Sequence, residues 1–261
     1  MADLFHKQAK NYAEARPSYP DELFCFIASK TPGHELAWDV GTGSGQAAVF
    51  LANIYKRVVA TDTSKEQLSY ATKRPNIDYR HTPSTLSLDD LHHHVAAPST
   101  VNLVTVAQAL HWFDLAAFYD KVNSVLTKPD GVFAAWCYTL PRVDPEVDSV
   151  LDRLYGELGP FWSPERHMVE DEYRSLWFPF DPVEGESHTG PFQFVTKLPM
   201  DLEAYQTYIR SWSAYQTAKE KGVELLTDGI VGELEKLWGG DAKLVKVVRF
   251  PIFLKIGRMK N

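Results

Sequence analysis

A cluster of three glycines directly after a short apolar run places the tightest limit on how this chain can fold. The apolar run covers residues 36–40, the sequence Gly-Thr-Gly-Ser-Gly occupies 41–45, and a helical spacing of apolar residues follows over about 46–54. Glycine tolerates the sharp turns that bring a backbone close to a ligand, and the N–H groups at the start of a helix can bind that ligand. The pattern predicts a strand, a turn and a helix that together bind a polar ligand.

The alternation of strands and helices continues through the first half of the chain. Further apolar runs, rich in β-branched residues, lie at 57–61, 100–107 and 132–136. Helical spacing separates them at 67–73 and 115–126, and Ser64 with Gln67 forms a capping box before the first of these helices. This order predicts an α/β fold with a doubly wound, mostly parallel sheet and helices on both faces.

The last third of the chain has a different pattern of apolar residues. Residues 193–197 and 243–256 alternate between apolar and polar side chains, and helical stretches near 201–218 and 222–238 lie between them. We expect the two alternating segments to form an antiparallel hairpin at the edge of the same sheet. No internal repeat or low-complexity linker interrupts the chain, so we expect a single domain over 1–261.

Charge disfavours nucleic acid as a partner. The chain has 27 Lys and Arg against 34 Asp and Glu, a formal net charge of −7, so its surface would on balance repel a polyanion. The longest apolar segments are much shorter than the roughly 20 residues that span a bilayer. We expect no membrane partner and no secretion signal, because the first residues mix charged and apolar side chains.

Cysteine and histidine usage points to a reduced compartment without a metal centre. Cys25 and Cys137 lie far apart and supply neither a disulfide framework nor a thiolate cluster, so we expect a cytoplasmic protein. The run 92–94 holds three adjacent histidines, whose side chains would point in different directions. We interpret this run as a solvated loop and expect no metal site.

An acidic residue follows the second apolar run at the position that would meet a ribose. Asp62 lies 21 positions after Gly41, where a carboxylate can accept both hydroxyl hydrogens of an adenosine ribose. A dinucleotide fingerprint would need a glycine where this chain has Gln46. The spacing G-x-G-x-G, with Asp39 two residues ahead of the first glycine, resembles the S-adenosylmethionine loop of class I methyltransferases. The resemblance implies a Rossmann-like, seven-stranded sheet, S-adenosylmethionine as cofactor with S-adenosylhomocysteine as product, and an Asp39 that helps to hold the amino-acid part of the cofactor.

Three further segments resemble one branch of this family. Residues 5–20 and 106–114, the latter reading Val-Ala-Gln-Ala-Leu-His-Trp-Phe-Asp, together with Ser-Trp-Ser at 211–213, resemble the small-molecule branch that contains trans-aconitate methyltransferases and their plant and fungal relatives. The resemblance implies an N-terminal lid over 1–30, a cofactor-binding core over 31–140, an acceptor-side insertion over 141–190 and a C-terminal part of the sheet over 191–261. It implies cofactor contacts from Tyr12, Arg16, Asp39, Gly41, Thr42, Gly43, Gly45, Asp62, Thr63, Ser84, Thr85, Ala107, Gln108 and Trp112. Ser84 and Thr85 stand where the family often has an acidic residue, so their hydroxyls or the backbone would make that contact.

The chemical class of the methyl acceptor determines which other residues the reaction needs. We expect a methyltransferase that acts on a small molecule, with O-methylation of a carboxylic acid as the leading hypothesis. A carboxylate is already ionised at pH 7 and needs no base, so Arg16, Tyr19 and Arg142 become candidates for holding it. A hydroxyl or amine acceptor would need a base, for which His111 is the candidate. Trp136 and Trp162 are expected at the acceptor, with core packing as the alternative for both and for Trp177 and Trp212.

Other classes of function stay open at this point. A nicotinamide-dependent dehydrogenase could use the same fold, although Gln46 disfavours it, and a non-catalytic protein could bind S-adenosylmethionine without transferring a methyl group. Base-amine methylation typically uses an N-P-P-Y-type segment after the fourth strand, whereas residues 107–111 here read Ala-Gln-Ala-Leu-His. The acceptor, its reacting atom and the oligomeric state are left open, and a monomer is compatible with the sequence.

Overall fold

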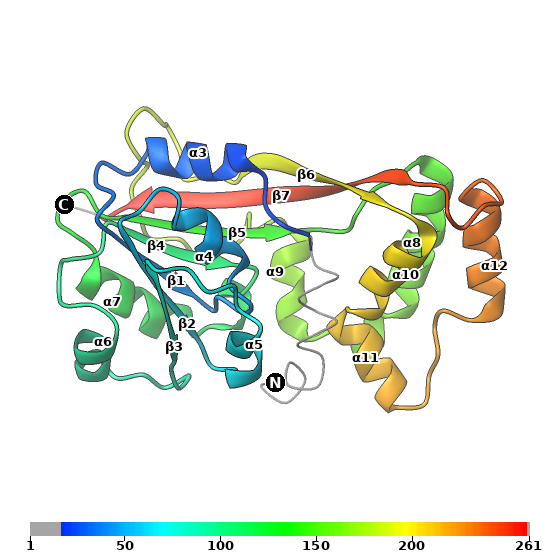
Figure 1. Ribbon diagram of the computed structural model, residues 1–261, viewed down its shortest axis with the longest axis horizontal. Coiled ribbons are helices and arrows are strands. Elements are labelled where there is room, and N and C mark those ends of the chain that lie inside the picture. The colour runs from blue at the N-terminus through cyan, green and yellow to red at the C-terminus, as the bar shows by residue number, and fades with distance from the viewer. Residues whose placement is uncertain (1–16, 260–261) are drawn as a thin grey trace.

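One mixed sheet of seven strands organises the molecule (Figure 1). A computed structural model describes residues 17–259 of the chain. The strands are β1 (Leu36–Val40), β2 (Arg57–Asp62), β3 (Ile77–His81), β4 (Leu103–Ala107), β5 (Val132–Tyr138), β6 (Phe192–Met200) and β7 (Lys246–Arg258). Their order is β3-β2-β1-β4-β5-β7-β6, with β7 antiparallel to both β5 and β6 and the other neighbours parallel. This arrangement confirms the expected fold class, including the antiparallel edge hairpin.

Helices cover both faces of the sheet, which is why its central strands are apolar throughout. Helices α3 (Asp21–Ser29) and α4 (Gln46–Leu51) pack on one face, in a core that includes Ala37 and Trp136. Helices α6 (Leu88–His94) and α7 (Leu115–Val125) pack on the other face, against Trp38 and Phe133. Adjacent strand residues such as Ala37 and Trp38 therefore enter opposite cores, as the two-residue period of a strand requires.

The edge hairpin is longer than the sheet it completes. Residues 252–258 of β7 pair with β5, whereas β6 pairs with β7 over 246–254, so one end of the hairpin projects beyond the parallel strands. That end carries a group of helices, at the right of Figure 1: α8 (Pro145–Glu157), α10 (Leu202–Arg210), α11 (Ser213–Glu220) and α12 (Asp228–Leu237). We call these the distal helices. They face the carboxyl ends of the parallel strands, where a ligand binds in folds of this kind.

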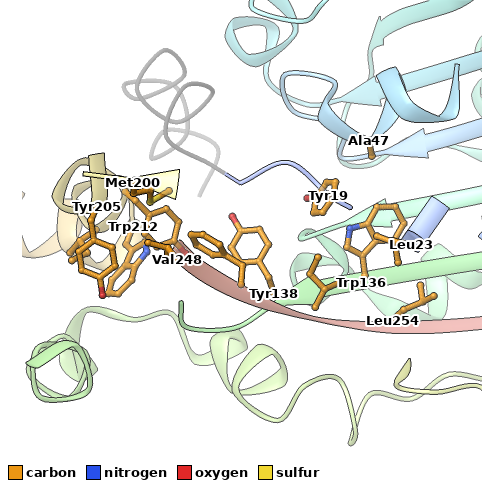
Figure 2. Packing of buried hydrophobic residues seen from close by; sticks show 14 of the residues in the cluster. Tyr19, Leu23, Ala47, Trp136, Tyr138, Met200, Tyr205, Trp212, Val248 and Leu254 are labelled. Carbon is orange, nitrogen blue, oxygen red and sulfur yellow. The ribbon is translucent and has the colours of Figure 1, made fainter. Parts of the chain in front are cut away.

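A continuous apolar core joins the sheet to the distal helices. Figure 2 shows its buried side chains running from Leu23 and Trp136, through Tyr138, to Trp212 and Tyr205. Aromatic contacts carry it across: the rings of Tyr138 and Phe250 lie 6.1 Å apart, and those of Phe250 and Tyr208 lie 5.0 Å apart. The position of the distal helices relative to the sheet is therefore set by packed side chains as well as by the hairpin.

The segment over 141–190 divides into two parts. After α8, the short helices η2 (Gly159–Phe161), η3 (Pro164–Arg166) and α9 (His167–Glu170) lead back toward the sheet. The chain then covers the face that α6 and α7 occupy, where Tyr173, Leu176 and Phe180 enter the core. Trp177 in this stretch is 55% exposed, so it is neither a core residue nor part of an enclosed aromatic wall.

Several expected boundaries differ from the structure, for local reasons. The helix expected over 46–54 ends at Leu51, and the one expected over 67–73 is α5 (Lys65–Ser69), because the chain turns soon afterwards into the next strand. The helical stretch near 201–218 is two helices, since Ser211 Oγ donates to the carbonyl of Tyr208 and the next residue is extended.

The interpretation of 92–94 as a loop is wrong: these histidines form the last turn of α6, which Ser87 caps by accepting from the Asp90 N–H. No helix within residues 17–259 has the length and apolar character needed to cross a bilayer.

Candidate active site

The glycine loop after β1 adopts a backbone that only glycine accommodates easily. Gly41, Gly43 and Gly45 have φ values of +65°, +58° and +82°. A Cβ on Gly45 would overlap the hydroxyl of Tyr79 and lie 2.9 Å from its ring, and a Cβ on Gly41 would lie 2.9 Å from that of Ala109. At Gly43, by contrast, the nearest atom to an added Cβ is 3.9 Å away. The loop is thus closely packed at its first and last glycines and less so at its middle one.

Asp62, at the end of β2, holds the middle of this loop. Its Oδ2 accepts from the Gly43 N–H and its Oδ1 accepts from the Ser64 N–H, each at 2.8 Å. Burial raises the pKa of this carboxyl, and the backbone donors partly offset that effect. Because each carboxylate oxygen has a further lone pair, Asp62 can still accept hydroxyl hydrogens from a ligand beside Gly43.

Asp39 is fully buried beneath the loop. Its Oδ2 accepts from Thr42 Oγ1 at 2.5 Å and its Oδ1 accepts from Thr105 Oγ1, on β4, at 2.7 Å. Burial raises the pKa of Asp39 to about 6, against the two hydrogen bonds that lower it. The carboxylate connects the loop to β4, and its charge sits in an apolar environment that a nearby cation would stabilise.

The loop after β4 adds a strained residue with an unpaired acceptor. Gln108 has a φ of +58°, its N–H donates to the carbonyl of Trp136 at 2.9 Å, and its Nε2 donates to that of Tyr138 at 3.2 Å. Its Oε1 is buried and has no hydrogen-bond partner in the part of the chain that the structure describes. A buried acceptor of this kind is costly unless a ligand or water pairs with it. Ala107 precedes it, and Trp112 follows in the short helix η1 (Leu110–Trp112).

His111, also in η1, is buried against an aromatic partner. Its Nδ1 forms a hydrogen bond with Tyr173 Oη at 3.0 Å, and its ring lies 4.8 Å from that of Trp112. Burial, with a smaller effect from the positive charge of Arg166, lowers the pKa of His111 to about 3. The imidazole is therefore neutral at pH 7 and is a weak base.

The structure describes three of the five remaining cofactor-binding candidates. Tyr12 and Arg16 lie outside the described residues. Thr63, Ser84 and Thr85 are exposed just after β2 and β3, at the same edge of the sheet as the glycine loop. This edge thus gathers the polar side chains that could border a bound cofactor.

The acceptor candidates are separated by the structure. Tyr19 and Trp136 are buried and pack edge to face, with ring centres 5.3 Å apart (Figure 2). Trp136 is thus part of the core, although its Nε1 has no partner within residues 17–259. The guanidinium of Arg142 donates to both carboxylate oxygens of Asp152, at 2.9 and 3.0 Å. Because Asp152 satisfies its charge, Arg142 is a poor candidate for holding an acceptor.

An aromatic cluster stands between the loop after β4 and the distal helices. The ring of Trp162 lies 5.3 Å from that of Tyr155 and 5.9 Å from that of Trp212. The guanidinium of Arg166 lies over two of these rings, 4.7 Å from the centre of Trp162 and 5.9 Å from that of Tyr155. Sequence reasoning identified Trp162 but missed Tyr155, Arg166 and Tyr173; the only signal was a cation in an aromatic-rich segment, four positions after Trp162.

Among residues 17–259, no group of three or more His, Cys, Asp or Glu side chains is arranged to hold a metal ion. His92 hydrogen-bonds with Ser124 Oγ, whereas His93 Nδ1 donates to the carbonyl of Asp89, so these two neighbouring rings point to different partners.

The sheet order, the antiparallel β7, the glycine loop and the acid after β2 define a Rossmann-like methyltransferase fold. A family model described as a methyltransferase domain matches residues 38–135. The chain is 32% identical, over 98% of its length and 95% of the relative, to a Dictyostelium discoideum protein described as a methyltransferase. It is 27% identical, over 80% of its length and 79% of the relative, to a Saccharomyces cerevisiae protein described as S-adenosylmethionine-dependent. A solved structure described as a type II methyltransferase from Anaeromyxobacter dehalogenans matches with a TM-score of 0.80 and 36% identity, over 94% of this chain and 99% of that one. The chain belongs to the class I S-adenosylmethionine-dependent methyltransferases.

Proposed function

We propose that this enzyme methylates a carboxylate oxygen of a small organic acid. The observation that supports this acceptor is the burial of His111, in the loop after β4, where its Nδ1 forms a hydrogen bond with Tyr173 Oη. Burial also lowers the pKa of His111 to about 3, and a buried, neutral imidazole suits a nucleophile that is already ionised. A hydroxyl or amine acceptor would need its proton removed, and His111 could do so only slowly.

The cofactor fits the residues at the edge of the sheet. Asp62 has lone pairs for two ribose hydroxyls beside the less closely packed Gly43, and the buried charge of Asp39 complements a cofactor that carries positive charge. The unpaired Oε1 of Gln108 offers an acceptor for a donor on the ligand. We extend the cofactor site, on the resemblance described above, to Tyr12, Arg16, Gly41, Thr42, Gly45, Thr63, Ser84, Thr85, Ala107 and Trp112.

Catalysis in this proposal is mostly positioning. When bound, S-adenosylmethionine supplies an electrophilic methyl group, which passes to a carboxylate oxygen as the carbon–sulfur bond breaks and the sulfonium becomes a neutral thioether. The chain aligns the acceptor behind that methyl group, and the aromatic side chains of 155–162 and Trp212 exclude water from it. No proton moves, so no base is required.

We also propose the finer family placement and the roles of the segments. The small-molecule branch related to trans-aconitate methyltransferases is supported by the resemblance over 5–20 and 106–114. In this proposal 1–30 is the lid, 31–140 binds the cofactor, 141–190 contributes to the acceptor side, and 191–261 completes the sheet of a single domain. The continuous core between sheet and distal helices supports the single domain.

The test begins with binding and ends with product chemistry. Calorimetric titration with S-adenosylmethionine, S-adenosylhomocysteine and NADH should show saturable binding of the first two alone. An assay with methyl-labelled cofactor over carboxylic acids, phenols and amines should then give a labelled product with the acids. Mild base should release the label as methanol, because it hydrolyses methyl esters and leaves methyl ethers and methylamines intact. A base-stable product, or label transfer only to phenols or amines, would overturn the carboxylate proposal.

A further inference from the structure

Arg166 has no carboxylate partner within residues 17–259, and its helix η3 packs against η1. Arg57, Arg80, Arg142, Arg153 and Arg174 each form a salt bridge with an acidic side chain. Arg166, at the end of η3, forms none with any residue of 17–259. Within the same residues its Nε–H, which donates to Tyr155 Oη at 3.1 Å, is the one guanidinium donor with a hydrogen-bond partner.

Two aromatic rings border the guanidinium of Arg166. The guanidinium lies 4.7 Å from the centre of Trp162 and 5.9 Å from that of Tyr155. Contact of a guanidinium with aromatic rings is attractive and restricts the arginine side chain. An arginine held in this way loses little conformational freedom when it binds an anion.

The position of Arg166 links it to the methyl-transfer site. Helix η3 packs against η1, which contains His111 and Trp112, and η2 packs against α11 of the distal helices. The positive charge of Arg166 acts on His111, after β4, and on Cys137, near the end of β5. Arg166 thus lies where the carboxyl ends of two central strands meet the distal helices.

Acidic neighbours exist, but each is bound to a hydroxyl. Glu170 accepts from Tyr155 Oη at 2.5 Å, and Glu165 accepts from Ser163 Oγ. Trp162 adds a second donor to the cluster, since its buried Nε1 has no acceptor within residues 17–259. The two terminal nitrogens of Arg166 and the Nε1 of Trp162 thus have no acceptor within residues 17–259, and an anionic ligand can pair with them.

We propose that Arg166 binds the carboxylate of the acceptor, and that the acceptor is an organic acid with a planar apolar body that packs on the aromatic cluster. This inference rests on the proposed function, because it names the residue that would select an acid at the same site. Arg166 takes the role that the sequence assigned to Arg142, whose charge Asp152 already satisfies.

The test measures acid binding to the full chain saturated with S-adenosylhomocysteine. Cinnamate and its neutral counterpart cinnamamide are titrated by calorimetry into the wild type, Arg166→Met and the matched control Arg142→Met, with benzoate and trans-aconitate as further acids. Methionine keeps most of the apolar length of arginine and removes only the charged fork. Thermal unfolding and the affinity for S-adenosylhomocysteine report whether each variant is folded.

The wild type and Arg142→Met should bind cinnamate at least about tenfold more tightly than cinnamamide, as expected for hydrogen bonds to a charged group. Arg166→Met should lose that preference while its affinity for S-adenosylhomocysteine changes less than about twofold, and Arg166→Lys should recover part of it. A wild type without the preference, an Arg166→Met that keeps it, or no binding of any of the three acids would overturn the inference.

Failure of this inference can be told apart from failure of the proposed function. If acids bind through Arg166 but no labelled ester forms, carboxylate methylation is wrong and the Arg166 site stands. If esters form and Arg166→Met leaves KM for the acid unchanged, the proposed function stands and the Arg166 site is wrong.

Discussion

The hydroxyl of Thr105 on β4 donates a hydrogen bond to Oδ1 of Asp39 on β1, over 2.7 Å, within the buried sheet. The other oxygen, Oδ2, accepts from Thr42 in the glycine loop. One carboxylate thereby connects two parallel strands to the loop that follows the first of them. Because both oxygens are used in this way and the side chain is fully buried, Asp39 holds the loop from below, whereas Asp62 accepts from the N–H of its middle glycine.

The raised pKa of Asp39 predicts a pH-dependent stability. Its folded pKa of about 6 exceeds the ordinary value of 3.8, so this group favours the folded state below pH 3.8 and loses that contribution as the pH rises through 6. Above pH 6 the buried charge costs about 3 kcal/mol. Asp39→Asn cannot ionise, so its unfolding free energy relative to the wild type should rise by about 2–3 kcal/mol between pH 4 and pH 7. Urea unfolding at several pH values measures this difference, and a difference independent of pH would contradict the assignment.

The lowered pKa of His111 gives the stability the opposite dependence on pH. Its folded pKa of about 3 lies below the ordinary 6.5, so its contribution to stability is complete above pH 6.5 and is lost as the pH falls toward 3. The wild type should lose about 1.4 kcal/mol per pH unit relative to His111→Gln over that range. The same urea series checks it. With a carboxylic acid acceptor, kcat should also stay flat between pH 6 and pH 8, and an ionisation near 7 that His111→Gln removes would show that His111 acts as a base.

Gly45→Ala should destabilise the enzyme. The substitution forces a side chain into a φ of +82° and against the ring of Tyr79, which together should lower the unfolding free energy by at least about 1–3 kcal/mol. The control is Gly156→Ala, in α8, where an added Cβ meets no atom within 4 Å. That change should be neutral or stabilise by up to about 1 kcal/mol. Equal effects of the two substitutions in a denaturant titration would argue against the tight packing of the loop.

Asp62→Ala should weaken binding of S-adenosylhomocysteine by about 1–3 kcal/mol, the scale of lost hydrogen bonds to a charged group. Part of the loss comes from the ribose contact and part from the Gly43 N–H, which loses its acceptor. Asp78→Ala removes a carboxylate of β3 that pairs with Arg57 and Arg80 away from the loop, and it should leave the affinity unchanged. Calorimetry measures both variants, and an unaltered affinity in Asp62→Ala would remove its role at the ribose.

Much of the cofactor side follows from short-range rules that sequence alone expresses. Three glycines after an apolar run require a backbone of positive φ, and an acid at the end of the next parallel strand must arrive at the same edge of the sheet. The cap at Ser64 is equally local, since its hydroxyl accepts from the N–H of Gln67 three residues later. Local patterns did not predict where the helices end. Helices α4 and α5 are shorter than their apolar spacing suggests, because the chain must turn into the next strand.

The acceptor side depends on contacts that residue spacing alone does not specify. The sequence does not distinguish Arg142 from Arg166, but in the structure Arg142 pairs with Asp152 of α8, whereas Arg166 lies over the rings of Trp162 and Tyr155. By sequence His111 is a candidate base, but the fold buries it beside Tyr173, 62 positions later, and this burial lowers its pKa. The sequence by itself determined the sheet, the glycine loop and the acids beside it, because strand period and turn chemistry act between near neighbours. Only the tertiary structure decided that Arg142 is paired with a carboxylate, that Arg166 has no such partner within residues 17–259, and that His111 is buried, because burial and charge pairing depend on how side chains pack in the fold.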